Sequence, residues 1–502
     1  MRLIYCHCGL SATACSPKPT ATFYNLPFTI KKMNSFDLIV LGSGPGGYVA
    51  AIRASQLGMK VAVVERESLG GICLNWGCIP TKALLKSAQV FNYINHAKDY
   101  GIEVSSAKAD FGAVVKRSRG VADGMSKGVQ FLLKKNKITV IMGNGKLVAA
   151  NKIAVTDANN QTTEYTAPHI IVATGGRSRE LPNLKQDGKK IIGYREAMTL
   201  PTQPKSMLIV GSGAIGVEFA YFYHSLGTKV TIVEYMPRMV PVEDEDVSKE
   251  LEKQYKMLGI DVYTNTNAEK IETTATGCQV TLKSNKDGAT KTIDCDIVLS
   301  AVGVTPNTEN IGLETLGIQL DKGFIITNQY YQTNVKGVYA IGDVIKVNNA
   351  PHPALAHVAS AEGILCVEHI KGMHVEPINY NNIPGCTYCQ PEIASVGYTE
   401  AKAKEAGYDI KVGKFPFTAS GKASAAGHKQ GFVKVIFDAK YGEWLGAHLI
   451  GANVTEMIAE VVVARKLETT GHEIIKSIHP HPTMSEAIME AAAAAYGEVI
   501  HL

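Results

Sequence analysis

Two cysteines, Cys73 and Cys78, are the side chains of this 502-residue sequence best placed to do chemistry. They lie where the sequence begins to predict a helix. Cα atoms five residues apart in a regular helix are about 8.6 Å apart, whereas a disulfide needs less than about 7 Å. If the pair bridges, the helix must be distorted. Pro80 supplies a cause, because it has no N–H to donate to the carbonyl of Trp76. Gly77 adds backbone flexibility between the two cysteines.

The location of the pair favours redox chemistry. A helix N-terminus lowers the pKa of a thiol and so favours a nucleophilic thiolate. Lys82, one turn beyond Cys78, would hold a positive charge near any cofactor that the inner sulfur touches. The alternatives are two core cysteines or half of a metal site. Zinc would need a second pair at suitable spacing, and none is adjacent, so no metal is expected.

A second reactive group is expected near the end of the chain, at His481. Its neighbours Pro480 and Pro482 confine it to extended backbone, which argues against an ordinary helix-surface histidine. Its pKa near neutrality suits proton exchange with a dithiol. Thr483 and Glu486 have the spacing of a capping box before an Ala-rich helix, so Glu486 either orients His481 or only caps that helix.

The elements that would position these groups occur twice. Each copy is a strand, a G-x-G-x-x-G turn, a helix and a second strand that ends in an acid eighteen residues after the third glycine. The residues are Gly42, Gly44, Gly47 and Glu65 in the first copy, and Gly211, Gly213, Gly216 and Glu234 in the second. Such a turn admits a pyrophosphate at the helix N-terminus, and the distal acid accepts a hydrogen bond from a ribose hydroxyl. The chain is therefore predicted to bind two dinucleotides.

The acid of the second copy also bears on which nicotinamide nucleotide binds. A carboxylate at the ribose repels the 2′-phosphate that an arginine would attract, so Glu234 favours NAD over NADP. Arg238 lies four residues further on and is within reach of a phosphate in principle, which leaves NADP as the alternative.

Composition excludes several classes of protein. Hydrophobic residues make up 45% and charged residues 19%, as in ordinary soluble globular proteins,. Four of the five net positive charges, at Arg2, Lys18, Lys31 and Lys32, precede the first acid. The remainder is nearly neutral, so neither a nucleic acid nor an anionic membrane is expected as a partner. Ten cysteines are too few for a disulfide scaffold and suit a reducing compartment,.

Residues 1–33 differ in composition from the rest of the chain and are interpreted as a leader or a mis-assigned start. They contain no acid and only one arginine, whereas transit peptides are typically Arg-rich. One interpretation is an upstream start with Met33 as the working initiator, in a bacterial cytoplasmic protein. The other is a transit peptide to the mitochondrial matrix or plastid stroma.

The sequence closely resembles the dihydrolipoyl dehydrogenase family, which belongs to the flavin disulfide reductases. The resemblance covers about residues 34–491 and rests on the run 70–82, the two dinucleotide units, Ala173-Thr174-Gly175, Tyr339-Ala340-Ile341-Gly342-Asp343 and 479–487. It implies an α/β fold with two Rossmann-like domains, a central domain and a C-terminal α+β interface domain. The implied boundaries are 34–177 for FAD, 178–305 for NAD, 306–378 for the central domain and 379–502 for the interface domain.

The resemblance also implies roles for particular residues. Cys73 would be the interchange thiol that meets substrate, Cys78 the charge-transfer thiol facing the flavin, and His481 of the partner subunit the base, oriented by Glu486. The residues implied to hold FAD are Gly42, Gly44, Gly47, Glu65, Lys82, Gly145, Thr174, Gly175, Gly342, Asp343, Ala356 and His357. Those implied to hold NAD are Gly211, Gly213, Gly216, Glu218, Glu234 and Gly303.

The implied activity is oxidation of protein-bound dihydrolipoyl groups with NAD as acceptor, by a homodimer with one tight FAD per subunit. The implied partners are the lipoyl-bearing acyltransferase of 2-oxo acid dehydrogenase complexes and the lipoyl carrier protein of glycine cleavage. Glutathione reductase, mercuric reductase and a noncatalytic docking subunit are the alternatives. Glu234 disfavours the first, and the absence of any cysteine after Cys389 disfavours the second.

Three features depart from the family pattern. Cys386-Thr387-Tyr388-Cys389 has a C-x-x-C spacing that invites a second redox or metal role, although two strand cysteines on alternate faces are the simpler interpretation. Trp76 is bulkier than usual between the reactive cysteines. The run Gly303-Val304-Thr305-Pro306 lacks the usual basic pair, which leaves NAD affinity open.

Overall fold

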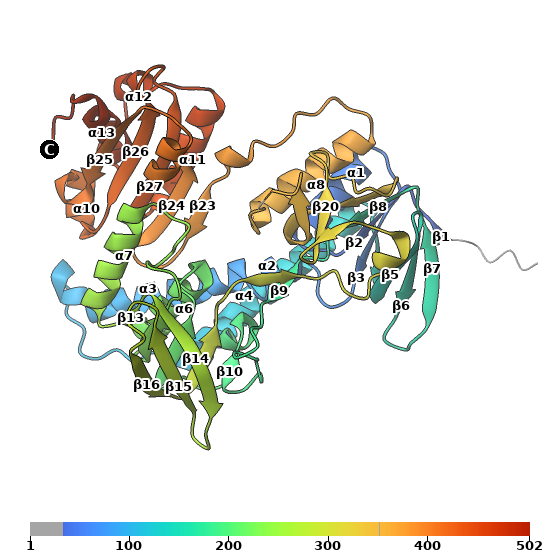
Figure 1. The fold of residues 1–502 in the computed structure, drawn as a ribbon, viewed down its shortest axis with the longest axis horizontal. Coiled ribbons are helices and arrows are strands. Elements are labelled where there is room, and N and C mark those ends of the chain that lie inside the picture. Colours follow the sequence, from blue (N-terminus) through green and yellow to red (C-terminus); the bar gives the residue numbers. More distant parts are fainter. Residues whose placement is uncertain (1–33, 351) are drawn as a thin grey trace, which may run out of the picture.

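The computed structural model describes residues 34–350 and 352–502, so the predicted leader lies outside the described residues. Figure 1 shows two lobes joined by a narrower waist. The waist contains α2 (Gly71–Asn75), part of α4 (Phe111–Lys135) and β9 (Gly176–Ser178). No helix among the described residues has the length and apolar character needed to span a membrane.

One lobe is built on a parallel sheet that contains the first dinucleotide unit. Its strands run in the order β21 (Val338–Ala340), β8 (His169–Val172), β2 (Leu38–Leu41), β3 (Val61–Glu65) and β4 (Thr139–Met142). The central strands are apolar and fully buried, as expected of a parallel sheet covered on both faces,. Helices α1 (Pro45–Gln56) and α8 (Ala356–Ile370) pack against each other, so a late segment of the chain completes this lobe.

The second dinucleotide unit forms a similar sheet in the other lobe (Figure 1). Its parallel strands are β10 (Ile191–Ile192), β17 (Ile297–Ser300), β11 (Ser206–Val210), β12 (Lys229–Val233) and β13 (Asp261–Tyr263). Helix α6 (Ala214–Ser225) follows β11, and α7 (Glu245–Leu258) follows β12. The predicted pair of Rossmann-like units is confirmed.

Smaller antiparallel sheets accompany the two units. β14 (Thr266–Thr273), β15 (Cys278–Ser284) and β16 (Thr290–Cys295) form a meander beside the second. β5 (Asn144–Ala149), β6 (Lys152–Thr156) and β7 (Thr162–Thr166), with β1 (Asn34–Ser35), form a sheet beside the first. β9 pairs with β18 (Val304–Pro306) in an antiparallel two-stranded sheet at the waist. A short sheet of β19 (Leu320–Asp321), β20 (Phe324–Thr327) and β22 (Ile345–Val347) completes the set.

The C-terminal segment forms the predicted α+β domain. Its antiparallel sheet runs in the order β23 (Gly385–Thr387), β24 (Glu392–Gly397), β27 (Trp444–Gly451), β26 (Phe432–Asp438) and β25 (Ile410–Pro416). Helices α11 (Val454–Lys466) and α13 (Glu486–Tyr496) pack on this sheet. Every residue of β26 and β27 is buried, so the sheet is a rigid platform for the loop before α13.

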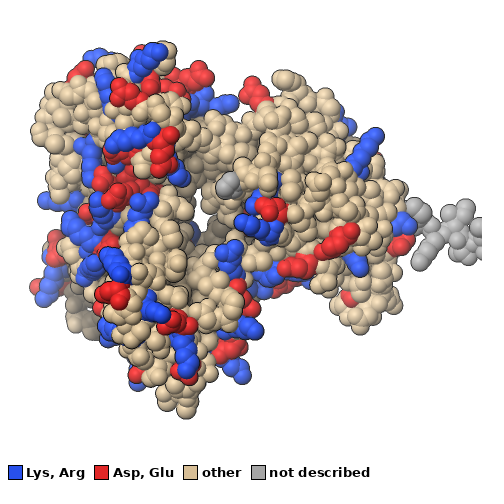
Figure 2. Space-filling model, viewed as in Figure 1, with Lys and Arg blue, Asp and Glu red and all other residues tan. Residues whose placement is uncertain are grey.

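A buried charge cluster fixes the C-terminal domain to the second dinucleotide unit. Lys434 on β26 has a side chain only 4% exposed, and its Nζ lies 2.9 Å from Asp244, 3.1 Å from Asp246 and 2.8 Å from Glu400. Asp244 also caps α7 by accepting from the Asp246 N–H. Burial opposes ionisation of Asp244, but the Lys434 ammonium holds the pKa of this carboxyl below its usual value. Elsewhere, Figure 2 shows positive and negative side chains interspersed over the visible face, with no large field of one sign.

We expect Lys434→Ala to lower the free energy of unfolding by about 3–5 kcal/mol, because it leaves the buried Asp244 carboxylate without its counter-charge,. Chemical denaturation followed by circular dichroism measures this loss. Lys466 makes an exposed pair with Glu376 at 3.5 Å, so Lys466→Ala is the matched control and should change stability by less than about 0.5 kcal/mol. Equal effects of the two substitutions would contradict the role assigned to the cluster.

Candidate active site

Cys73 and Cys78 form a disulfide whose Cα atoms are 4.7 Å apart. The expected helix distortion is present. Helix α2 ends at Asn75, α3 (Cys78–Asn95) begins at Cys78, and the intervening Trp76 and Gly77 leave helical geometry. Cys78 is thus the first residue of a long helix, where unpaired N–H groups stabilise a thiolate.

The bulky Trp76 is held between two arginines. The guanidinium carbons of Arg119 on α4 and Arg195 on α5 (Tyr194–Ala197) lie 4.7 and 4.6 Å from the Trp76 ring centre. Arg119 also donates to the carbonyl of Asn75, and Arg195 donates to Glu67 at 2.7 and 2.8 Å. Trp76 therefore anchors the loop that carries both cysteines, a role its sequence position alone did not indicate.

The first glycine-rich turn has the shape that a dinucleotide pyrophosphate requires. Gly42 has φ +107°, and a Cβ there would lie 2.2 Å from the carbonyl oxygen of Ala173. A Cβ on Gly47 would lie 2.0 Å from the Gly42 carbonyl oxygen, so helix and strand approach closely. A Cβ on Gly44 would meet nothing within 4 Å, and α1 begins there without a side-chain cap. The open, uncapped helix N-terminus fits an anionic phosphate group.

The second turn repeats this geometry. Gly211 has φ +102°, a Cβ on Gly213 would meet nothing within 4 Å, and a Cβ on Gly216 would lie 2.0 Å from the Gly211 carbonyl oxygen. The acids that end β3 and β12 are also held alike. Glu65 accepts from the Ser43 N–H at 3.1 Å and hydroxyl at 2.6 Å; Glu234 accepts from the Ser212 N–H at 2.8 Å and hydroxyl at 2.7 Å.

These two serines were missed by the sequence analysis, although the repeat contained the signal. Ser43 and Ser212 occupy the same position, between the first two glycines of each copy. By fixing one oxygen of the acid, each serine leaves the carboxylate oriented toward the turn. The structure thus fits two nucleotides bound in the same manner, each with an acid in place for its ribose.

The residues expected to close over the first nucleotide come together at the ends of β8 and β21. Thr174 donates to the carbonyl of Asn307 at 2.6 Å, and Gly175 follows it. Gly342 and Asp343 form a short turn after β21, where burial raises the pKa of Asp343. The Gly342 N–H donates to the buried Glu362 at 2.7 Å, a contact that sequence reasoning did not anticipate.

Three further expected residues flank this site. Ala356 and His357 begin α8, which packs on α1, and His357 Nε2 lies 3.0 Å from the carbonyl oxygen of Pro384. Gly145 lies on β5, where a Cβ would be 2.5 Å from Leu41 Cδ1. Its small size therefore permits β5 to approach the end of β2.

An ion pair links the redox helix to the second dinucleotide unit. Lys82 Nζ on α3 lies 3.0 Å from both carboxylate oxygens of Glu218 on α6. Glu218 also accepts from the Tyr388 N–H at 2.9 Å. Gly303, expected at the same nucleotide, has φ +104° and open space where a Cβ would lie. The pairing of Lys82 with Glu218 spans 136 residues, so motif spacing gave no sign of it.

His481 and Glu486 form a hydrogen-bonded pair, with Nδ1 2.8 Å from Oε1. The second carboxylate oxygen accepts from the Thr483 N–H at 2.8 Å, in the turn before α13. The helix itself has Ser485 as its N-cap with no side-chain cap, so the expected capping box is not formed there. Burial opposes ionisation of Glu486, but its contacts with Thr483 and His481 lower its pKa. His481 remains 76% exposed, which leaves its other ring nitrogen free for a partner outside this chain.

The histidine pair and the disulfide lie in different parts of one chain. Figure 1 shows α12 (Gly471–Lys476) and α13 at the outer end of the C-terminal domain, away from α2 at the waist. A single chain therefore does not bring His481 beside Cys73.

The second cysteine pair is not bridged. Cys386 and Cys389 are both free thiols. Burial raises the pKa of Cys386 to about 11 and raises the pKa of the fully buried Cys389 still further. Only Cys386 belongs to β23, so the expectation of two strand cysteines is wrong for Cys389. Among residues 34–350 and 352–502 no cluster of metal-ligating side chains is present.

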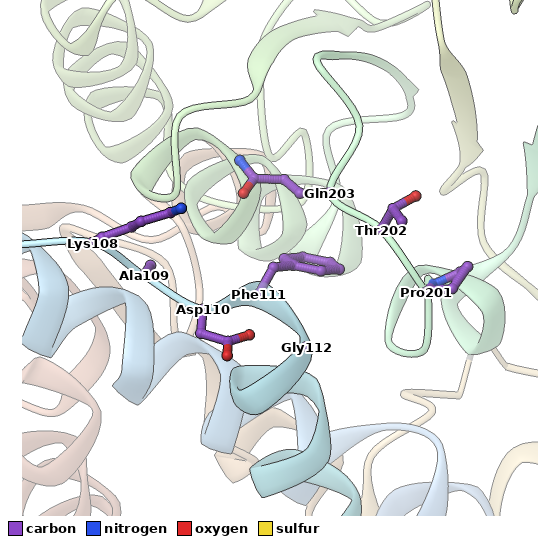
Figure 3. A pocket seen from close by; sticks show the side chains of 8 residues that line it. All are labelled: Lys108, Ala109, Asp110, Phe111, Gly112, Pro201, Thr202 and Gln203. Carbon is purple, nitrogen blue, oxygen red and sulfur yellow. The ribbon is translucent and has the colours of Figure 1, made fainter.

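The linings of two cavities do not include the reactive groups. One, of about 490 Å³, is lined by residues 108–112, where α4 begins, and by residues 201–203 (Figure 3). The other, of about 480 Å³, lies beside β9 and is lined by residues that include Arg177, Tyr194 and Arg195. Neither lining contains Cys73, Cys78 or His481.

Comparisons with known proteins decide the family. The pyridine nucleotide-disulphide oxidoreductase model matches residues 36–363, and the dimerisation domain of the same family matches residues 383–492. The chain belongs to the pyridine nucleotide-disulphide oxidoreductase family. It is a flavoprotein disulfide oxidoreductase that uses FAD and NAD, and its C-terminal domain is the family's dimerisation domain.

Individual relatives cover nearly the whole chain. The chain is 51% identical over 483 residues to a dihydrolipoyl dehydrogenase from Rhizobium etli, covering 93% of this chain and 99% of the relative. It is 49% identical over 467 residues to the Zymomonas mobilis protein of that name, with the same coverage. The crystal structure of LpdA from Mycobacterium tuberculosis matches with a TM-score of 0.84 at 28% identity, covering 92% of this chain and 99% of that one.

The role expected of Glu234 in this family member is testable by substitution. We expect Glu234→Ala to weaken NAD binding by about 1–3 kcal/mol, the cost of leaving a buried ribose hydroxyl unpaired. The difference in affinity between NAD and NADP should become smaller. Isothermal titration with both nucleotides measures this, and the thermal midpoint checks that the turn at Ser212 still folds. Unchanged affinities in a folded variant would exclude the ribose assignment.

Proposed function

We propose that this family member is a dihydrolipoyl dehydrogenase, which oxidises protein-bound dihydrolipoyl groups to lipoyl groups with NAD as acceptor. The observation that carries the proposal is the 2.8 Å contact between His481 and Glu486 in a chain with the Cys73–Cys78 disulfide. Oxidation of a dithiol needs a base for the substrate proton and a disulfide to receive its electrons. The names of relatives at 49–51% identity support the same substrate.

The chain's own residues would divide the reaction between a base, a disulfide and two nucleotide cradles. His481 of the partner subunit takes a proton from a substrate thiol, and the resulting thiolate attacks Cys73, releasing Cys78 as a thiolate. The second substrate thiol then displaces Cys73, so the lipoyl disulfide leaves and the enzyme holds a dithiol. The first glycine-rich turn with Glu65 would hold FAD, which would supply an acceptor for an electron pair, and the second with Glu234 would hold NAD, which would supply a hydride acceptor. Lys82 and the N-terminus of α3 stabilise the Cys78 thiolate.

The exposure of His481 and its separation from the disulfide support a homodimer. The imidazole faces away from its own chain, and the domain that carries it is of the dimerisation type. We propose an active site shared across the interface, with one FAD per subunit. We propose the FAD and NAD residues that the family resemblance implies. We also propose its domain boundaries, which are 34–177, 178–305, 306–378 and 379–502.

The proposed partners are the lipoyl-bearing acyltransferase of a 2-oxo acid dehydrogenase complex and the lipoyl carrier protein of glycine cleavage. Both present the same dihydrolipoyl group, so the site chemistry is common to them. The bacterial relatives support a cytoplasmic location. Initial rates with dihydrolipoamide, glutathione disulfide and mercuric ion, each with both nicotinamide nucleotides, separate this proposal from the two reductase alternatives.

The role of His481 is tested by His481→Gln. Loss of a positioned base should slow dihydrolipoamide oxidation by about 10²–10⁴-fold. Reduction of an artificial dye by NADH bypasses the substrate thiol and should keep its rate. Steady-state assays of both reactions on the same yellow, dimeric preparation make the comparison. Equal loss of both activities, together with loss of FAD or of the dimer, would make His481 a structural residue instead.

A further inference from the structure

Tyr388 occupies a junction of three parts of the molecule. It follows β23 of the C-terminal domain, in the Cys386–Cys389 segment that departs from the family pattern. Its neighbours are Lys82, on the redox helix α3, and Glu218, on α6 of the second dinucleotide unit. No step of the proposed reaction uses this tyrosine.

Tyr388 contacts both members of the ion pair through different groups. Its backbone N–H donates to Glu218 Oε1 at 2.9 Å. Its ring centre lies 4.3 Å from Lys82 Nζ, within the range of an attractive cation–π contact. The same carboxylate oxygen that accepts from Tyr388 lies 3.0 Å from the ammonium, so the three groups form a closed arrangement.

The arrangement restricts a side chain that is otherwise free to move. Lysine carries four rotatable bonds, and an ion pair alone fixes its ammonium only loosely. The Lys82 side chain is 32% exposed, whereas Glu218 is 7% exposed. The Tyr388 ring covers one side of the ammonium and Glu218 holds another, so Lys82 has a defined position one turn beyond Cys78.

We propose that Tyr388 is a positioning residue, which holds the Lys82 ammonium in place to stabilise the reduced form of the Cys73–Cys78 pair. The inference rests on the proposed redox role of that disulfide. Reduction by a dithiol converts the disulfide and two reducing electrons into one thiol and one thiolate, with one proton taken up. The added negative charge on Cys78 then interacts with the fixed ammonium. The functional residue of the C-x-x-C segment is thus the tyrosine and not a cysteine.

The size of the effect follows from electrostatics. When a positive charge near a thiolate moves by a few ångströms, the electrostatic attraction between them changes. This change alters the dithiol-to-disulfide ratio by roughly two- to tenfold. We therefore expect Tyr388→Leu to lower the ratio of dithiol to disulfide at Cys73–Cys78 by roughly two- to tenfold. Tyr388→Phe keeps the ring and the backbone N–H, so it should keep the wild-type ratio.

The experiment equilibrates the holoenzyme with mixtures of reduced and oxidised dithiothreitol without oxygen. Acid quenching, alkylation and mass spectrometry then give the fraction of Cys73–Cys78 present as dithiol. This measurement needs neither dihydrolipoamide nor NAD. If the wild-type pair does not interconvert at all, the proposed function fails; if it does and Tyr388→Leu leaves the ratio unchanged, only the present inference fails.

Two controls separate positioning from a general structural effect. Lys440 Nζ lies 4.6 Å from the exposed ring of Tyr441, so Tyr441→Leu removes a similar contact in the same domain and should leave the ratio unchanged. A double-mutant cycle with Lys82→Met tests the coupling directly. Once Lys82 is removed, Tyr388→Leu should have no further effect. Additive effects of the two substitutions, or a lowered ratio in Tyr388→Phe, would overturn the proposal.

Discussion

The structure depends on one backbone constraint, the break between α2 and α3. Cysteines five residues apart cannot bridge within a continuous helix. Trp76 and Gly77 interrupt the helix and bring the Cα atoms of Cys73 and Cys78 to 4.7 Å. The same break makes Cys78 the first residue of a new helix, where a thiolate is stabilised. The arginines that enclose Trp76 come from α4 and α5, so elements outside the loop maintain the break.

The rest of the molecule holds this loop between two dinucleotide-type units. Both nucleotide cradles use a glycine turn, an uncapped helix N-terminus and a serine-anchored acid, one in each lobe. The loop lies at the waist between them (Figure 1). Lys82 on the redox helix pairs with Glu218 on the second unit. The Lys434 cluster attaches the C-terminal domain to that unit, and with it the segment that contains Tyr388.

Local patterns predicted the parts of this arrangement that are local in sequence. The glycine turns and their acids lie within 24 residues of each other in each copy, so the spacing was sufficient to predict two Rossmann-like units. The sequence left open whether Glu486 contacts His481 or only caps the following helix. The structure places Glu486 against His481, whereas α13 has Ser485 as its N-cap with no side-chain cap. Pairings across the fold were not predictable, because Glu218 and Tyr388 are 170 residues apart. The Cys386–Cys389 spacing was ambiguous, and the structure shows two unbridged thiols, of which Cys386 is half-buried and Cys389 buried.

The central claim is that electrons from a dihydrolipoyl dithiol enter at Cys73–Cys78, and a single-turnover thiol map tests it most directly. Oxidised holoenzyme is mixed with dihydrolipoamide in the absence of NAD and oxygen, quenched in acid, unfolded and alkylated. Comparison with the unmixed enzyme by mass spectrometry shows which cysteines gain label. The account predicts a gain at Cys73 and Cys78 and no change at Cys386 or Cys389, which are thiols before and after. Oxidation of dihydrolipoamide with the Cys73–Cys78 disulfide left intact would contradict it.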